Sequence, residues 1–381
     1  MAKESLNGVL IRISCIDSNY IAMSQTQPLP PFACTYTPNI PELLMQLDCS
    51  LIISTYQAGK VVMLSPADQD HLVQLPRNYE HPMGIAISGD KMAIASKSEV
   101  NILAKSSNLA QHQPEQPGKY DTLYIPRATY NTGPLDLHDL IWGTDGLWAV
   151  NTKFSCLSLI DENYSFTPKW QPKFISELMP EDRCHLNGVA LKDGKPTYVS
   201  CLGESDTAGG WRANKAKGGI LMDVDSNEII LKGLSMPHSP RIYDNKTFIL
   251  ISGTGELAEV DINKGSYTVI NQVPGFARGM SKYGDYLFIG LSKIRTRSSS
   301  FQDLPISKKS LFSGIVVVHL PTGSIVGNIR YQTSVEEIFD VQVLPALRRP
   351  GILNNSKALH NFAIVTPTDS FWAVKEELIT H

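Results

Sequence analysis

The sequence has no apolar run of the roughly 18 residues that a membrane-spanning helix needs. It also has no block of basic residues, and its formal net charge is −3, so nothing in the composition points to a nucleic acid or an anionic membrane as a partner. Its first residues lack the basic flank and long apolar core of a secretory signal. We therefore expect a cytoplasmic protein with no nucleic-acid and no membrane partner.

Several chemical motifs are missing as well. The six cysteines form no CxxC pair, and in a chain of 381 residues they are expected to be buried thiols rather than a disulfide framework. The GxSxG motif of a nucleophilic serine is absent, and so is the GxxxxGK[ST] motif of a phosphate-binding loop. These absences remove the motif-based arguments for a serine hydrolase or a nucleotide-binding enzyme.

What the chain does contain is a repeat. Six segments open near residues 81, 136, 185, 237, 276 and 336, and each has the same order of features. A polar or Gly-flanked start leads into an apolar triplet, then a Gly, Asp or Asn turn, then a strand rich in Val, Ile, Phe and Tyr. The region 185–241 shows the unit most fully, with four short strands in about 50 residues. This pattern predicts an all-β fold, a β-propeller of about six four-stranded blades, with five or seven blades as alternatives.

The two ends of the repeat are complementary. The sixth opening has an inner strand but no convincing outer strands, whereas residues 51–75 have outer strands but no inner one. We expect these N-terminal strands to pair with the C-terminal inner strand and so close the ring, because closure removes an exposed sheet edge. The predicted organisation is a partly disordered extension over 1–39, a propeller over 40–350 and a C-terminal tail over 351–381 that packs on the propeller.

Polar residues gather where the predicted inner strands begin, and four of the nine histidines lie in four consecutive openings. Inner strands of a propeller run in the same sense, so these side chains should meet at one mouth of the central channel. One interpretation is a site for a divalent metal (zinc, iron or calcium) with ligands His81, His138, His185 and His238. The alternative is that these rings bond the backbone of neighbouring blades or a ligand. The alignment allows both, because His81 and His185 share a column while His138 lies two residues later.

Other residues are candidates for ligand binding at the same mouth. A Gly-rich loop over residues 203–219 is dense in charged and aromatic side chains for a simple connection, and it is either a lid or binding loop or a structural inter-strand hairpin. The candidates from this loop and from the openings are Asn187, Trp211, Arg212, Arg241, Arg278 and Asp340.

Several longer runs resemble a known family. They include STYQAGK from Ser54, EDRCHLNGV from Glu181, GESDTAGGWR from Gly203, SMPHSPR from Ser235 and EIFDVQVLP from Glu337. These runs are similar to a bacterial family of conserved hypothetical proteins known only as domain of unknown function 4915, and the resemblance covers about residues 40–350. It implies no activity. More remotely, LNGVA from Leu186 is similar to the strands of six-bladed lactonase-type and NHL-type propellers, some of which hold a metal in the channel.

The sequence therefore leaves two functions open. The first is a binding module that holds a small molecule or a protein at the His- and Arg-rich mouth of the channel. The second is a metal-dependent hydrolase or lyase whose site is built on the channel histidines.

Overall fold

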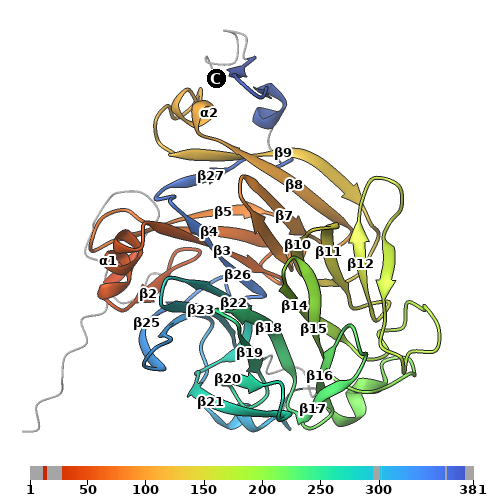
Figure 1. The fold of residues 1–381 in the computed structure, drawn as a ribbon. Helices are drawn as coiled ribbons and strands as arrows, with labels where there is room; N and C mark the ends of the chain where they lie inside the picture. Colours follow the sequence, from red (N-terminus) through yellow and green to blue (C-terminus); the bar gives the residue numbers. More distant parts are fainter. Residues whose placement is uncertain (1–11, 15–27, 295–300, 302, 357, 374–381) are drawn as a thin grey trace, which may run out of the picture.

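The computed structural model describes residues 12–14, 28–294, 301, 303–356 and 358–373. Its main feature is a ring of six sheets (Figure 1). Each sheet contributes one innermost strand, and each of these strands contacts the next one until the last contacts the first. The innermost strands are β6 (Ile85–Ser88), β10 (Leu137–Gly143), β14 (Leu186–Lys192), β18 (Pro237–Tyr243), β22 (Phe276–Tyr283) and β26 (Asp340–Pro345). The predicted six-bladed propeller is confirmed.

Three neighbouring blades are simple four-stranded meanders, each built from consecutive strands. Outside β10 lie β11 (Gly146–Asn151), β12 (Cys156–Ile160) and β13 (Thr167–Trp170). Outside β14 lie β15 (Lys195–Cys201), β16 (Gly219–Asp223) and β17 (Ile229–Leu234). Outside β18 lie β19 (Lys246–Ile251), β20 (Glu256–Asp261) and β21 (Ser266–Gln272).

The ring is closed by strands from both ends of the chain. The inner strand β26 pairs antiparallel with β3 (Cys49–Thr55), in a register that runs from Asp340 opposite Ser54 to Pro345 opposite Cys49. The blade is completed by β4 (Lys60–Pro66) and β5 (Leu72–Asn78), which follow β3 outward in the same sheet as β26 (Figure 1), although more than 260 residues separate them from β26 in sequence. The predicted closure is confirmed, and it leaves no open edge between the first and last blades.

Two blades carry additional strands. The blade of β22 continues through β23 (Tyr286–Ser292), β24 (Gly314–His319) and β25 (Ser324–Tyr331) to β2 (Cys34–Tyr36) and β1 (Arg12–Ser14). The blade of β6 continues through β7 (Lys91–Ala95), β8 (Glu99–Ser106) and β9 (Thr122–Asn131) to β27 (Pro350–Ile352), which is parallel to β9. Strand β2 lies within the predicted extension over residues 1–39, and it belongs to a blade.

The hairpins follow from the turn residues that mark the repeat. Asp193 and Gly194 have φ angles of 52° and 76°, and Asp244 and Asn245 have 51° and 61°. Two successive positive φ angles define the type I′ turn, whose twist matches that of the strands it joins. Between the blades, apolar side chains interlock, as where Val150 of β11 packs in one cluster with Val189 of β14 and Val199 of β15.

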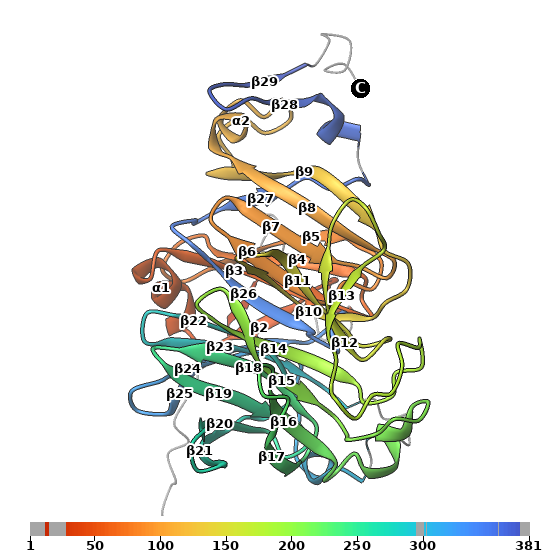
Figure 2. The same ribbon diagram turned by 45° about the vertical axis from the view of Figure 1, so that its right-hand side comes forward.

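The remaining elements lie on the outside of the ring. Helix α1 (Asn39–Gln46) buries Ile40, Leu43 and Leu44 against the blades of β26 and β22. Beyond β27, η4 (Ala358–Phe362) leads into the hairpin of β28 (Ala363–Val365) and β29 (Ser370–Trp372), which Figure 2 shows over α2 (Ser107–Gln111). Two further 3-10 helices are η1 (Gly210–Asn214) and η3 (Pro305–Lys308). Among the described residues, no helix has both the length and the apolar character to cross a membrane.

Candidate functional site at the channel mouth

A cavity of about 380 Å³ lies at the mouth of the ring, where the inner strands begin. Six of the predicted site residues line it, namely His138, His185, Trp211, Arg212, His238 and Arg278. They come from four of the six blades and from the loop between β15 and β16. Its size lies in the ordinary range for small-molecule sites.

The convergence of these side chains follows from a shared backbone shape. Four consecutive openings begin with a non-glycine residue in the left-handed region, at His81, Asp136, His185 and Met236, with φ between 46° and 52°. Such residues are uncommon, so their recurrence shows that the sequence repeat is also a repeat of backbone conformation. The side chain two residues after each of them occupies the same place in its blade, and at three of the four openings that side chain is His138, Asn187 or His238.

His138 and His238 are held in the same way. Nδ1 of His138 lies 3.1 Å from the carbonyl oxygen of Asp136 and 2.9 Å from Oγ1 of Thr152. Nδ1 of His238 lies 3.0 Å from the carbonyl oxygen of Met236 and 2.9 Å from Oγ of Ser252. A carbonyl oxygen only accepts hydrogen bonds, so Nδ1 carries the proton in both rings.

The two hydroxyl groups strengthen this assignment, because each donates its own proton elsewhere. Thr152 donates to the carbonyl of Leu186 and Ser252 to the carbonyl of Ala277, both in the next blade. Each hydroxyl oxygen is thus left to accept from Nδ1 of its histidine. In the neutral rings, Nε2 then has a free lone pair. Nε2 of His238 is buried and has no hydrogen-bond partner among the described residues.

Both rings are disposed to stay neutral. Burial, together with the neighbouring His185, lowers the pKa of His138 well below its ordinary value. Burial and the charge of Arg278 lower the pKa of His238 in the same direction. The mouth therefore presents two unprotonated ring nitrogens, which can accept hydrogen bonds from a ligand.

His185 is oriented differently, by a carboxylate. Its Nδ1 lies 2.9 Å from Oδ1 of Asp182, while Oδ2 of Asp182 accepts hydrogen bonds from Trp211 at 2.9 Å and Arg212 at 3.0 Å. Burial by itself raises the pKa of Asp182, but the hydrogen bonds from His185 and Trp211 and the charge of Arg212 bring it below its ordinary value. The rings of His185 and His138 meet edge to face at 4.7 Å.

Arg278 is also paired. It forms an ion pair with Glu337, and its guanidinium lies 4.9 Å from the ring centres of both Phe276 and Phe339. The ion pair and the two cation–π contacts together hold the guanidinium in one position. Among the described residues that line the mouth, Arg212 and Arg278 thus each have a carboxylate partner.

The other predicted ligand-binding residues lie deeper in the channel and are engaged with one another. Arg241 makes a bidentate ion pair with Asp139, at 2.8 and 3.0 Å. Asn187 bonds Pro237 and Ser200. The space that Asn187, Arg241 and Asp340 line measures only about 10 Å³, which is about the room of one water molecule. These three residues hold the blades together below the pocket.

Asp340 occupies a position of the inner strands at which a polar residue and a glycine alternate from blade to blade. Asp139, Ser239 and Asp340, one in every second blade, accept a backbone N–H from the next blade, from Val189, Gly279 and Ile85. The intervening blades carry glycine at this position because the strands approach closely, and a Cβ on Gly279 would lie 2.6 Å from Cα of Asp340. Burial and the nearby carboxylate of Asp139 raise the pKa of Asp340 to about 6, against the opposing charge of Arg241.

His81, the remaining metal candidate, does not line the pocket. Its ring packs on Tyr56 at 4.8 Å between ring centres. Across the residues that the structure describes, no group of three or more His, Cys, Asp or Glu side chains is placed to hold a metal ion. The predicted zinc, iron or calcium therefore has no ligand set within that part of the chain.

The Gly-rich loop forms a wall of the pocket. Trp211, in η1, is 8% exposed and packs in a cluster with Leu202, Met236, Phe276 and Ile306. Its ring also stacks on His185, with centres 4.4 Å apart. A side chain packed to this extent favours a fixed wall over the predicted lid. The loop connects the antiparallel hairpin of β15 and β16 and contains the 3-10 helix η1.

Three of the pocket residues that were not among the candidates are Asp182, Phe276 and Phe339. Asp182 lies three residues before His185, a spacing at which a carboxylate can reach the ring. A single Asp in a loop is common, however, so its presence in the sequence does not mark it as a partner of the histidine. Phe276 and Phe339 occupy the same two positions of their openings as His185 and His138. A search for polar side chains alone passes over them.

This geometry defines the class of protein, a six-bladed β-propeller. Within that class the chain belongs to the family called domain of unknown function (DUF4915), whose model matches residues 38–353. The resemblance inferred from the sequence is confirmed. The family label assigns no activity.

Among solved structures, the chain is similar to one from the crystal structure of a nidogen/laminin complex. The TM-score is 0.50 and the sequence identity 9%, over 78% of this chain and 99% of that one. At this identity the likeness shows the fold alone. No curated protein matches the sequence.

Proposed function

We propose that the propeller is a binding module whose mouth pocket takes a small uncharged organic molecule with hydroxyl or amino groups on an apolar or planar body. The observation that carries the proposal is the pair of ring nitrogens on His138 and His238. Both accept hydrogen bonds, and Nε2 of His238 is buried without a partner among the described residues. A buried acceptor that lacks a donor costs about 1–3 kcal/mol, and a ligand donor recovers much of that cost.

The charge balance of the mouth supports an uncharged ligand. Among the described residues, Arg212 and Arg278 are paired with Asp182 and Glu337, and Lys293, the other cation of the lining, is exposed, so no buried, unpaired cation in the described part of the pocket selects an anion. The aromatic rings of Trp211, Phe276 and Phe339 offer flat surfaces for the ligand body. Polar acceptors between aromatic walls suit a planar molecule that carries donors.

Phenol and anisole form a matched pair of probes for this proposal, because they share a ring and only phenol has a donor. Binding is measured by saturation-transfer NMR and calorimetry, and we expect phenol to bind in the millimolar range and anisole about tenfold more weakly. His238→Phe, which keeps a ring but removes the acceptor, should weaken phenol about tenfold. His71→Phe, at an exposed site, is the control and should change nothing. Equal affinities for the two probes would contradict the proposal.

A second candidate function, acid–base catalysis, is favoured by one contact. Asp182 holds Nδ1 of His185, which leaves Nε2 of that ring as the atom that exchanges protons, as in enzymes with a carboxylate-oriented histidine. Hydrolysis of 4-nitrophenyl acetate is a simple assay for it. If His185 is the base, His185→Gln should lower the rate about hundredfold, whereas Asp182→Asn should lower it less and change the pH profile. If the unaltered protein hydrolyses the ester no faster than the two variants do, catalysis is excluded and binding is left as the function.

The other expectations from the composition, a cytoplasmic location and the absence of nucleic-acid and membrane partners, stay predictions.

A protein ligand at the mouth is the remaining alternative for the binding module. Its contacts would include the exposed side chain of Arg212, so Arg212→Ala should weaken a protein partner more than it weakens phenol.

A further inference from the structure

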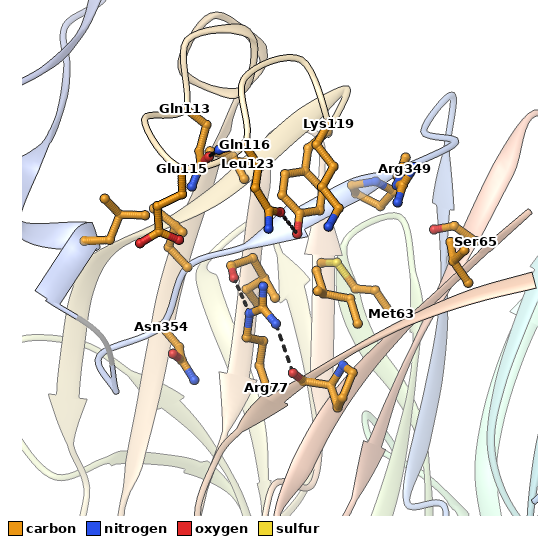
Figure 3. A pocket seen from close by; sticks show the side chains of 18 of the residues that line it. Met63, Ser65, Arg77, Gln113, Glu115, Gln116, Lys119, Leu123, Arg349 and Asn354 are labelled. Carbon is orange, nitrogen blue, oxygen red and sulfur yellow. Dashed lines mark hydrogen bonds between the residues drawn. The ribbon is translucent and has the colours of Figure 1, made fainter. Parts of the chain in front are cut away.

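A second cavity, also of about 380 Å³, lies on the outside of the ring. It lies between two neighbouring blades. Strand β5 forms one wall, and the segment from α2 to β9 together with β27 forms the other (Figure 3). None of its lining residues belongs to the mouth pocket. It is therefore independent of the function proposed above.

The charges of this side pocket are not balanced. Arg77, Lys119 and Arg349 line it, whereas Glu115 is the one carboxylate among its described lining residues. Figure 3 shows Glu115 at the opposite end of the pocket from Arg349, with Arg77 between the two walls. Within the described part of the chain, none of the three basic side chains forms an ion pair with a carboxylate.

Arg77 is fixed in place before any ligand arrives. Its Nε donates to the carbonyl of Ile352 at 2.9 Å and one terminal nitrogen donates to the carbonyl of Pro76 at 3.0 Å. The second terminal nitrogen has no bond to a described residue. Lys119, which is half-buried, lies 5.9 Å from the ring centre of Tyr120. Cations that are partly removed from water and lack a counter-ion attract an anion, and a preorganised guanidinium binds a carboxylate with little loss of entropy.

The rest of the lining is mixed, and its apolar part forms the floor of the pocket. Met63 and Ile352 belong to one core cluster and Leu123 to another, and Leu75 packs against both. The floor of the pocket is thus the seam between two cores. A ligand body that fills it removes apolar surface from water, which favours binding in proportion to the area covered.

From this combination we propose that the side pocket binds an organic anion with a compact apolar body, such as a medium-chain carboxylate. The carboxylate lies among Arg77, Lys119 and Arg349, and the chain lies along Met63 and Leu75. The two pockets of the molecule then differ in a measurable way, because the mouth selects an uncharged donor and the side pocket selects an anion.

Octanoate and octanol test the proposal by isothermal titration calorimetry on the full chain, since they share an apolar body and differ in the charged group. We expect one octanoate per chain and an affinity for octanol about tenfold lower. Lys119→Gln and Arg349→Gln should each weaken octanoate about three- to tenfold and leave octanol unchanged. Both side chains reach solvent, so these variants should fold.

Two control variants show whether octanoate binds to the cations of this pocket or to cations elsewhere on the protein. Lys192→Gln, at the exposed end of β14, removes an equal charge at a residue that does not line the pocket. Arg212→Gln removes a cation from the mouth. Octanoate should bind both controls as it binds the unaltered protein. The proposal is overturned if octanoate shows no saturable binding up to about 10 mM, if octanol binds as tightly, or if Arg212→Gln rather than Lys119→Gln removes the binding.

Discussion

Acidification should destabilise the protein through His238. The pKa of this ring is well below its ordinary value because the ring is buried and close to Arg278. The folded protein therefore keeps the ring neutral in a pH range where the unfolded chain binds a proton, so the free energy of unfolding falls as the pH falls. Each pH unit below about 6.5 costs ~1.4 kcal/mol for as long as the folded ring stays neutral.

Two other buried groups contribute to the same curve. His138 acts with the same sign, because its pKa is also lowered. Asp340 acts with the opposite sign: its pKa is raised to about 6, so the folded state takes up a proton below pH 6 that the unfolded chain takes up only near its ordinary value of 3.8. Between about pH 6 and pH 4, for as long as both folded rings stay neutral, the three groups together should lower the free energy of unfolding by ~1.4 kcal/mol per pH unit.

The contribution of His238 can be isolated with His238→Asn. Asparagine is the natural choice, because Asn187 occupies the equivalent position in the preceding blade and is well accommodated there. Urea unfolding at several pH values between about 5 and 8 should show a slope smaller by ~1.4 kcal/mol per pH unit in the variant. His319→Asn, at a partly exposed site, should keep the slope of the unaltered protein. If His238→Asn also keeps that slope, the ring is charged in the folded protein and the reasoning on its buried acceptor is wrong.

Three further outcomes follow from the structure. Deletion of residues 1–78 removes β3, β4 and β5, so the shortened chain should lose its cooperative thermal transition by circular dichroism; a cooperative transition would contradict the closure. Trp211→Ala should cost about 3–5 kcal/mol in urea unfolding because the side chain is buried, whereas Arg212→Ala, which removes a half-exposed ion pair, should cost about 1 kcal/mol or less; similar values for both would mean that Trp211 does not pack as a wall. Arg241→Met should cost about 3–5 kcal/mol, because it leaves Asp139 buried and unpaired, and Asp139→Asn in the same chain should restore part of the loss; no restoration would show that the carboxylate is not the source of the cost.

The sequence by itself determined the propeller, its size of about six blades and the way the ring closes. These features rest on local rules: the period of two along a strand, the turns at Asp193-Gly194 and Asp244-Asn245, and a repeat of about 50 residues. The gathering of His138, His185, His238 and Arg278 at one mouth follows from the same repeat, because equivalent positions of successive blades are brought to equivalent places.

Only the tertiary structure decided what each of these side chains does. His81 shares its column with His185, but it packs on Tyr56, whereas His185 meets Asp182 and Trp211, because the loops next to each strand differ in length and course. The side pocket has no sequence signal at all, since its walls come from β5, β9 and β27, which are brought together by ring closure and by the parallel pairing of a C-terminal strand. Strand periodicity is a local property of the chain, whereas burial and charge balance depend on which distant segments the fold places in contact.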